Sequence, residues 1–421
     1  MLLGCIADDF TGATDLASML VRGGMRAVQL IGVPGADDPV PDADALIVAL
    51  KSRTAPVREA VADSLAAFRW LRAAGARQFF FKYCSTFDST DEGNIGPVAD
   101  ALIEALGCGF ALACPAFPEN ARSVYQGHLF VGTSLLNESG MENHPLTPMR
   151  DANLVRVLSR QTTGTVGLVP FATVAQGAQA IRRAMTGLKE QGRRYAIVDA
   201  VTDADLVAIG EAAESHALIT GGSGVAMGLP ANFRRAGLLA EASADNAALP
   251  EVGGLAAVLA GSCSRATLSQ IGRARAELEV LDLDALATPD ADALIAQALE
   301  WTAPRLGETP VVIAASATPE RVAALQERMG RAAAGELVEA ALAGIADALV
   351  ARGVRRLVVA GGETSGAVAK RLGVRSLRIG AEIDPGVPWT YAERTGGAGL
   401  RLALKSGNFG AADFFLKAFA T

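Results

Sequence analysis

Two adjacent carboxylates, Asp8 and Asp9, stand directly after a short apolar run in the stretch GCIADDFTGATD. Carboxylates at this position could accept the proton of a substrate hydroxyl or hold a Mg²⁺ ion through water. Adjacent side chains leave an extended strand in opposite directions, so we expect the two to have different roles. Thr11 can cap a helix that begins at Gly12, which would leave both carboxylates available for catalysis. The alternative is that Asp9 is itself the cap and Asp8 a solvated strand end.

The segment LKSRT follows a second apolar run and supplies Lys51 and Arg53. An arginine can bind both oxygens of a carboxylate, although both charges could equally be solvated loop residues. A third run ends in KYCSTFDST, where Lys82 precedes hydroxyl and carboxylate groups that suit a polyhydroxy acid, although ordinary turns use the same residue types. We predict that Arg53 and Lys82 bind a substrate carboxylate. A lone histidine such as His128 is more often structural than catalytic. The further substrate-binding candidates are Ser85, Thr86, Asp88, Ser89 and His128.

Three turns rich in glycine and serine follow apolar runs in the C-terminal half of the chain, in GSCSRAT, GGETSGAV and KSGNFG. Such turns expose backbone N–H groups that can bind phosphate. None is a P-loop or a dinucleotide-binding glycine fingerprint. Each turn alone is ambiguous, but the coincidence of three favours a nucleotide. Together with the polyol-acid candidates, this division indicates a phosphotransferase.

The candidate residues lie at the ends of apolar runs of strand length that alternate with helical patterns. In the first half the runs cover residues 2–6, 45–50, 78–83, 110–114, 195–198 and 217–220, and helices are predicted over 57–74 and 174–191. In the second half the runs cover 255–260, 310–314, 356–360, 377–380 and 400–404. Strands that are apolar on both faces and separated by helices predict a mostly parallel sheet flanked by helices, in Rossmann-like layers. In such sheets ligands bind beyond the carboxyl ends of the strands.

The periodic pattern lapses between residues 231 and 254, where Pro, Ala, Asn and Gly dominate. We therefore predict an α/β protein with an N-terminal domain over 1–230, a linker over 231–254 and a C-terminal domain over 255–421. A length of 421 residues, half of them hydrophobic, agrees with two domains of ordinary size. The active site is expected in the cleft between the two domains.

Charge and cysteine content exclude several classes of partner. The net charge of -7 arises from 38 basic and 45 acidic residues without blocks of one sign, so neither nucleic acid nor a membrane surface is an expected partner. No stretch approaches the roughly 20 apolar residues of a membrane span, and no secretion signal is visible. The cysteines form no CxxC pair, so we expect reduced thiols in a cytoplasmic protein. The sequence does not determine the oligomeric state, and a homo-oligomer is one possibility.

At these motifs the chain resembles the four-carbon acid sugar kinase family, over essentially its whole length. The first half carries the resemblance in IADDFTGATDLA, LKSRT, KYCSTFDST, NIGPV, CPAFPEN, YQGHLFVG, LLNESGMENHPLTPM, DAVTDADL and TGGSG. The second half carries it in GSCSRAT, GGETSGAV, EIDPGVPW and LALKSGNFG. The longer motifs are specific, whereas TGGSG alone is not. Ala121 and Ala381 stand where the family pattern has Gly and Pro.

The resemblance implies an N-terminal domain that binds a sugar acid and a C-terminal domain that binds ATP, with Mg²⁺ expected alongside it. The implied reaction is ATP-dependent phosphorylation of the terminal (4-) hydroxyl of a four-carbon sugar acid, a 3-oxo-tetronate, in carbohydrate acid catabolism. The ATP contacts that the resemblance implies are Ser262, Ser264, Gly361, Gly362, Glu363, Thr364 and Gly407.

Three alternative functions stay open on the sequence. A threonate or erythronate kinase of the same family would act on a substrate that differs at one carbon, and residue spacing does not separate a ketone from a hydroxyl. A non-catalytic sugar-acid-binding protein would use the same cleft, but it would normally carry a secretion signal. A phosphatase with an aspartyl nucleophile is less favoured, because Asp8 and Asp9 lack the intervening residue that such loops usually have.

Overall fold

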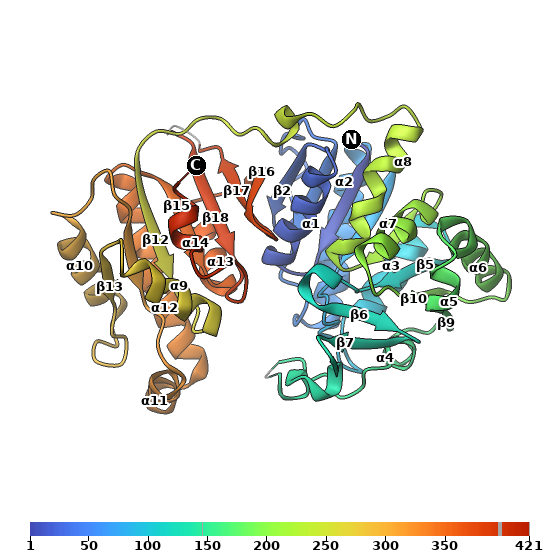
Figure 1. The fold of residues 1–421 in the computed structure, drawn as a ribbon, viewed down its shortest axis with the longest axis horizontal. Coiled ribbons are helices and arrows are strands. Elements are labelled where there is room, and N and C mark those ends of the chain that lie inside the picture. Colours follow the sequence, from blue (N-terminus) through green and yellow to red (C-terminus); the bar gives the residue numbers. More distant parts are fainter. Residues whose placement is uncertain (145, 395–397, 421) are drawn as a thin grey trace. The chain divides into compact units, whose positions relative to one another are not determined.

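The N-terminal unit, residues 1–247, is built on a parallel sheet whose strands are buried along nearly their whole length (Figure 1). The computed structural model describes residues 1–144, 146–394 and 398–420. Apolar runs form these strands because helices cover the sheet and leave no exposed face for polar side chains. The strand order is β2 (Ala27–Ile31), β3 (Ala45–Ala49), β1 (Leu3–Ala7), β4 (Gln78–Lys82), β11 (Leu218–Gly221), β5 (Ala111–Cys114), β10 (Tyr195–Val198) and β9 (Val166–Val169).

Helices connect these strands and cover the sheet. They are α1 (Phe10–Arg22), α2 (Val57–Ala73), α3 (Ile95–Leu106), α4 (Leu154–Gln161), α5 (Phe171–Val174), α6 (Ala178–Glu190), α7 (Asp203–Ala212) and α8 (Leu229–Arg235). α1 packs on β2 and β3, whereas α2 packs on β1 and on α3. α1 follows β1 after only two residues, and α2 and α3 follow the loops after β3 and β4. The loops between these elements therefore meet at one edge of the sheet.

A small antiparallel sheet interrupts the chain after β5. It consists of β6 (Arg122–Tyr125), β7 (His128–Val131) and β8 (Ser134–Leu135), and Figure 1 shows it at the end of the unit opposite the chain's N-terminus. Val124 pairs with Ala200, which follows β10, so the β6–β7 hairpin of this small sheet lies beyond the carboxyl ends of the strands. Ala121, just before β6, has a φ of 58°, a left-handed conformation that favours glycine.

The C-terminal unit, residues 248–421, has a mixed sheet. Its first five strands in spatial order are parallel, and only β17 runs in the opposite direction, between β18 and β16. The order is β13 (Val280–Asp282), β14 (Val311–Ala314), β12 (Leu255–Ala260), β15 (Val354–Ala360), β18 (Leu400–Lys405), β17 (Val387–Ala392) and β16 (Ser376–Asp384). The helices of this unit are α9 (Arg265–Ala274), α10 (Ala291–Thr302), α11 (Pro319–Met329), α12 (Arg331–Ala351), α13 (Gly362–Arg371) and α14 (Phe414–Lys417). α9 follows β12 and α13 follows β15, so glycine- and serine-rich turns again lie at carboxyl ends of strands.

The prediction of an α/β fold with mostly parallel sheets flanked by helices is confirmed. Strands β2, β9, β13 and β17 and the small antiparallel sheet were not among the predicted elements. The helix predicted over 174–191 begins only at Ala178, as α6, after Gly177, whose φ is 86°. Residues 231–235 of the expected linker lie in α8. No helix in the described part of the chain is both long and apolar enough to span a membrane.

Candidate functional site

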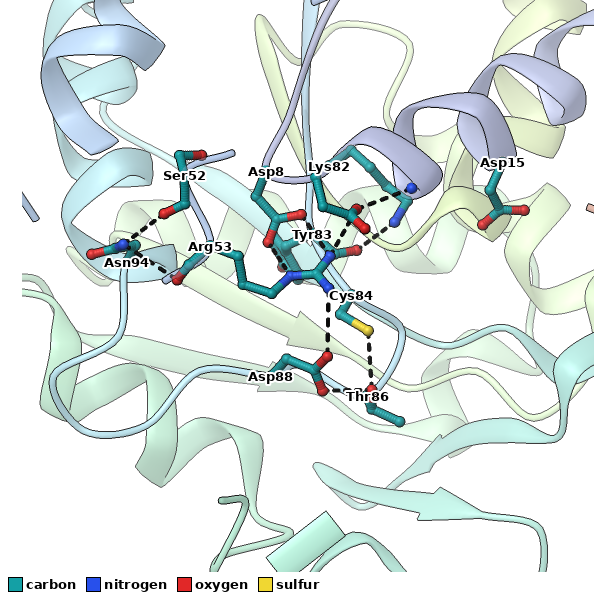
Figure 2. A network of polar contacts seen from close by, with 12 residues as sticks. Asp8, Asp15, Ser52, Arg53, Lys82, Tyr83, Cys84, Thr86, Asp88 and Asn94 are labelled. Carbon is teal, nitrogen blue, oxygen red and sulfur yellow. Dashed lines mark hydrogen bonds and ion pairs between the residues drawn. The ribbon is translucent and has the colours of Figure 1, made fainter. Parts of the chain in front are cut away.

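Arg53 lies at the centre of a carboxylate cluster in the N-terminal unit (Figure 2). Its Nε and Nη2 donate to Oδ2 and Oδ1 of Asp8, both at 2.9 Å. Nη2 is also 2.8 Å from Oδ1 of Asp9, and Nη1 is 3.6 Å from Oδ2 of Asp88. These residues follow the adjacent strands β1, β3 and β4, so the carboxyl edge of the sheet brings together side chains that are far apart in the sequence.

The two adjacent aspartates have different surroundings, as expected. Asp9 is the N-cap of α1 and accepts a hydrogen bond from Gly12 N at 3.0 Å, so the prediction that Thr11 caps a helix beginning at Gly12 is wrong. The Asp8 side chain is 7% exposed and both of its oxygens contact Arg53, whereas the Asp9 side chain is 31% exposed. Both contacts of Asp9 use Oδ1, and Oδ2 has no hydrogen-bond partner among the described residues.

Burial and charge oppose each other in this cluster. Burial raises the pKa of Asp8, and the neighbouring guanidinium of Arg53 acts in the opposite direction. Burial alone would lower the pKa of Arg53, but the charges of Asp8 and Asp9 hold that pKa well above its ordinary value. Arg53 is therefore a permanent cation that offsets part of the negative charge at the sheet edge.

The loop after β4 brings further predicted residues to the cluster. Thr86 donates to Oδ1 of Asp88 at 2.6 Å, and the sulfur of Cys84 is 3.0 Å from the Thr86 hydroxyl. Phe87 and Asp88 have φ values of 63° and 24°, which non-glycine residues rarely adopt. Such strain persists only where the surroundings enforce it, and it is concentrated at functional sites.

Lys82 lies beside the N-terminus of α1. Its ammonium donates to the carbonyl of Tyr83 at 2.7 Å and would be 3.0 Å from a Cβ placed on Gly12. The side chain is buried, and no carboxylate is paired with it among the described residues. A buried ammonium next to a helix N-terminus suits a negatively charged ligand group.

Of the other predicted substrate-binding residues, Ser89 lines a small cavity together with Asp8, Arg53 and Asp88. Lys51 is exposed, and Ser85 makes no side-chain hydrogen bond with the described residues. The Ser89 hydroxyl bonds to Gln161 of α4 at 3.2 Å. His128 lies in the hairpin, where Nδ1 is 2.8 Å from the carbonyl of Gln126. Their predicted contacts with a substrate stay predictions.

Two residues with an evident role in shaping the site were not among the candidates. Asn94 donates from Nδ2 to the carbonyls of Ser52 and Ala55, at 2.7 and 2.9 Å, and so fixes the loop that carries Arg53. Its signal in the sequence is its position in the motif NIGPV, directly before α3.

Asp199 was also missed. It directly follows β10, is fully buried, and accepts hydrogen bonds from the backbone N–H groups of Gln126, Gly127 and Phe171 at 2.6, 2.9 and 2.9 Å. These bonds hold the turn of the hairpin that carries His128. The signal is a carboxylate at the end of an apolar run, as for Asp8.

The three predicted phosphate turns of the C-terminal unit lie at adjacent strand ends and are joined by hydrogen bonds. Ser264 caps α9 and also donates to the carbonyl of Gly407 at 2.6 Å. Gly361 N donates to the carbonyl of Lys405 at 2.9 Å, and Ser262 N donates to the carbonyl of Ala360 at 3.1 Å. β12, β15 and β18 are neighbours in the sheet, which explains why these turns meet.

Glycine is required where these turns pack on one another. A Cβ on Gly407 would lie 2.1 Å from the Ser262 hydroxyl, and a Cβ on Gly261 would lie 2.3 Å from the Thr364 hydroxyl. Gly361 has a φ of 129°, which L residues rarely adopt. No side chain caps α13, which begins directly after Gly361, and the N-terminus of a helix is a favourable place for an anion.

A pocket of about 780 Å³ opens beside these turns, entirely within the C-terminal unit. Its volume falls within the range of small-molecule sites. The polar part of its lining includes Ser316, Thr318, Glu363 and Thr364. Aliphatic side chains of α11 and α12, such as Val322, Leu325 and Val338, also line the pocket, so it offers apolar surface for a ring as well as polar groups.

Among the residues that the structure describes, no three or more His, Cys, Asp or Glu side chains are arranged to hold a metal ion. Mg²⁺ in nucleotide sites is bound chiefly by phosphate oxygens and water, with only one or two carboxylates. A metal ion that arrives already bound to phosphate oxygens would need few ligands from the protein.

Residues 3–229 match the model of a sugar-binding N-terminal domain, and residues 257–415 match that of a nucleotide-binding C-terminal domain. A Burkholderia multivorans protein named 3-oxo-tetronate kinase is 62% identical over 418 residues, which cover 99% of this chain and 96% of that protein. A Cupriavidus necator protein of the same name is 59% identical over 98% of this chain and 95% of its own length. A crystal structure from Salmonella typhimurium LT2, which carries the description tRNA synthase, is 43% identical and has a TM-score of 0.90, with coverage of 99% and 98%.

The two domain models together span most of the chain, in the order that the resemblance implied. The kinase relatives match over nearly the full length of both proteins. The chain therefore belongs to the four-carbon acid sugar kinase family and is a phosphotransferase.

Proposed function

We propose that this chain uses ATP to phosphorylate the terminal (4-) hydroxyl of a four-carbon sugar acid, a 3-oxo-tetronate, to its 4-phosphate. The names of the Burkholderia and Cupriavidus relatives support the choice of substrate. The observation that carries the mechanism is the cluster of Asp8, Asp9 and Asp88 around Arg53, in the unit that matches a sugar-binding domain.

We assign the proton acceptor to Asp9. A kinase that acts on an alcohol needs a group that accepts the hydroxyl proton and orients the attacking oxygen. Asp9 is more exposed than Asp8, and its Oδ2 has no partner in the described part of the chain. Asp8 has both oxygens on Arg53 and acts as the residue that positions this guanidinium.

Lys82 and Arg53 are the proposed partners of the substrate carboxylate. Arg53 already uses Nε and Nη2 on Asp8 and Asp9, and only its Nη1 contact, 3.6 Å from Asp88, is long. An ammonium has three donors, and Lys82 uses one in its hydrogen bond to the carbonyl of Tyr83. Lys82 therefore contributes more to carboxylate binding than Arg53, whereas the sequence suggested that the arginine binds the carboxylate in the bidentate manner.

The proposed ATP site is the pocket of the C-terminal unit together with the turns beside it. ATP supplies the phosphoryl group, and Mg²⁺ is expected to arrive with it. The uncapped N-terminus of α13 and the glycine turns at Gly361 and Gly407 suit the phosphates, and the aliphatic lining suits the base. Phosphoryl transfer requires the terminal phosphate to reach the hydroxyl of the acid held by the N-terminal unit.

The reaction is tested by measuring ADP release with 3-oxo-tetronates, threonate and erythronate of both stereochemical series. We expect turnover with a 3-oxo-tetronate to have the highest kcat/KM, and phosphorus NMR of the product to show a phosphate on carbon 4. Higher kcat/KM with threonate or erythronate would move the assignment to that substrate. Folded protein that releases no ADP with any of these acids would refute the proposal.

The nucleotide site is tested with a matched pair of glycine variants. Gly361→Ala introduces a side chain at a φ of 129°, whereas Gly307→Ala adds a Cβ in the same unit whose nearest neighbour is the Arg305 carbonyl oxygen at 4.0 Å. We expect Gly361→Ala to raise the KM for ATP about tenfold while the KM for the acid changes little, and Gly307→Ala to behave as wild type. Equal ATP affinity in both folded variants would contradict the assignment.

A further inference from the structure

Lys405 is a fully buried lysine at the end of β18 that begins the motif KSGNFG but was not a candidate site residue, and the proposed reaction assigns it no role. Its ammonium donates to the carbonyl oxygens of Ser406 and Gly407, at 3.0 and 3.1 Å, and to the Thr267 hydroxyl at 3.2 Å. No carboxylate is paired with it in the described part of the chain. Burial lowers the pKa of Lys405 to about 7, because water is lost without a countercharge.

The carbonyl oxygen of Gly407 is the point where two of the glycine and serine turns are fastened together. It accepts hydrogen bonds from the hydroxyls of Ser264 and Thr267, at 2.6 and 2.9 Å, as well as from the ammonium of Lys405. The carbonyl of Lys405 itself accepts from Gly361 N at 2.9 Å, which adds the third turn. One residue therefore contacts all three turns that the proposed function assigns to phosphate.

The bonds from Lys405 determine where the following backbone N–H groups point. In a trans peptide the C=O and the next N–H point in opposite directions. Since the carbonyls of Ser406 and Gly407 both turn toward the buried ammonium, the N–H groups of Gly407 and Asn408 turn away from it. Neither N–H group has an acceptor among the described residues. Two successive N–H groups that diverge from the interior in this way form an anion-binding nest.

We propose that Lys405 is a positioning residue of the nucleotide site, which holds the carbonyls of residues 406 and 407 inward so that the next two N–H groups receive a phosphate of the nucleotide. The inference rests on the proposed nucleotide site and adds to it the residue that shapes its phosphate loop. A bound phosphate also supplies the negative charge that the buried ammonium lacks, so the cation favours the nucleotide without touching it.

The test replaces Lys405 with methionine, which keeps the length of the side chain and removes its charge and donors. Nucleotide binding is measured by calorimetry on the full-length protein with ATP alone, and KM is measured for both substrates. We expect Lys405→Met to weaken ATP binding about tenfold or more, with the KM for the acid within about twofold of wild type. The matched control Lys370→Met removes an exposed lysine of α13 and should bind ATP as wild type does.

Two further results keep the inference separate from the proposed function. Wild-type protein that binds no ATP would refute the nucleotide site itself. Wild-type protein that binds ATP, together with Lys405→Met that binds it equally well, would overturn only the role of Lys405. If Lys405→Met does not fold, Thr267→Val provides a second test. It removes the hydroxyl that donates to the carbonyl of Gly407 and is expected to weaken ATP binding about threefold. ATP binding by Thr267→Val equal to wild type would then overturn the proposal.

Discussion

Arg53 binds Asp8 through two hydrogen bonds, from Nε to Oδ2 and from Nη2 to Oδ1, each 2.9 Å long. The two residues meet because β1 and β3 are neighbouring parallel strands in which Ala7 lies opposite Ala49. This contact occupies the face of the guanidinium that would otherwise bind a substrate carboxylate in the bidentate manner. The relationship makes Asp8 a partner of the protein's own cation and leaves Asp9 as the carboxylate with an unoccupied oxygen.

Asp9→Asn should lose mainly kcat. Asparagine caps a helix about as well as aspartate, so α1 keeps its N-terminal hydrogen bond while the proton acceptor is removed. We expect kcat to fall roughly 100-fold or more, the usual contribution of general base catalysis, with the melting temperature nearly unchanged. Steady-state kinetics and thermal unfolding of the same preparation measure both quantities. A near-normal kcat would remove Asp9 from the role of proton acceptor.

Asp8→Asn should lose mainly stability and substrate affinity. The amide places an N–H group against a guanidinium that can only donate, so one hydrogen bond of the buried pair is lost. Asp9 and Asp88 still neutralise Arg53, so we expect a cost of about 2–3 kcal/mol, below the range for fully unpaired buried charges. Urea unfolding measures this cost. If Asp8 were the base instead, Asp8→Asn would lose more kcat than Asp9→Asn.

Lys82→Met should raise the KM for the acid about tenfold or more, because a hydrogen bond to a charged group contributes about 1.5–3 kcal/mol. The uncharged polyol of the same length is the control substrate, since it has no carboxylate to lose. We expect the wild type to bind the acid much more tightly than the polyol, with the polyol measured as a competitive inhibitor. Lys82→Met should lose most of this difference in affinity. A variant that discriminates as wild type does would show that the ammonium serves another group. The same comparison with Arg53→Ala measures the smaller share assigned to Arg53.

The strand ends and the chemistry near them could be predicted from the sequence, but the pairing of side chains could not. Apolar runs identify β1, β3 and β4, and polar residues after them identify the sheet edge. That Asp8 meets Arg53 depends on β1 and β3 being neighbours in the sheet, which no local pattern encodes. Similarly, Asp9 and Thr11 are both good N-cap residues, and propensity alone does not decide between them.

The backbone conformation of the site loops could not be predicted from the sequence either. Nothing in the letters of KYCSTFDST indicates that Phe87 and Asp88 have positive φ values, because this strain is enforced by tertiary contacts. The three phosphate turns were recognisable from glycine and serine, whereas Lys405, which directly follows the apolar run 400–404 and begins the motif KSGNFG, was not singled out. Residues that hold a loop from below thus have weaker sequence signals than residues that line it.

Asn94→Ala should raise the KM for the acid and leave the KM for ATP unchanged. The side chain holds the carbonyls of Ser52 and Ala55, so its loss frees the loop that carries Arg53. We expect a stability loss of about 1–2 kcal/mol from the unsatisfied carbonyls and a severalfold rise in the KM for the acid. Asn94→Asp is a second variant, because it keeps the size of the side chain but cannot donate when ionised. A rise in the KM for ATP of the same size would indicate general unfolding rather than a local effect.

Acid should destabilise the N-terminal unit in part through His216. Burial, helped by the charges of Lys189 and Arg182, lowers the pKa of His216 from its ordinary value of 6.5 to about 4. Between these values the unfolded chain binds a proton that the folded chain does not, so the free energy of unfolding falls as the pH decreases from 6.5 toward 4. His216→Phe keeps the ring contact with Phe110 and removes the proton. We expect its stability relative to wild type to rise by about 2 kcal/mol between pH ~7 and pH ~5, measured by urea unfolding. Parallel pH profiles for the two proteins would show that His216 is not buried as a neutral ring.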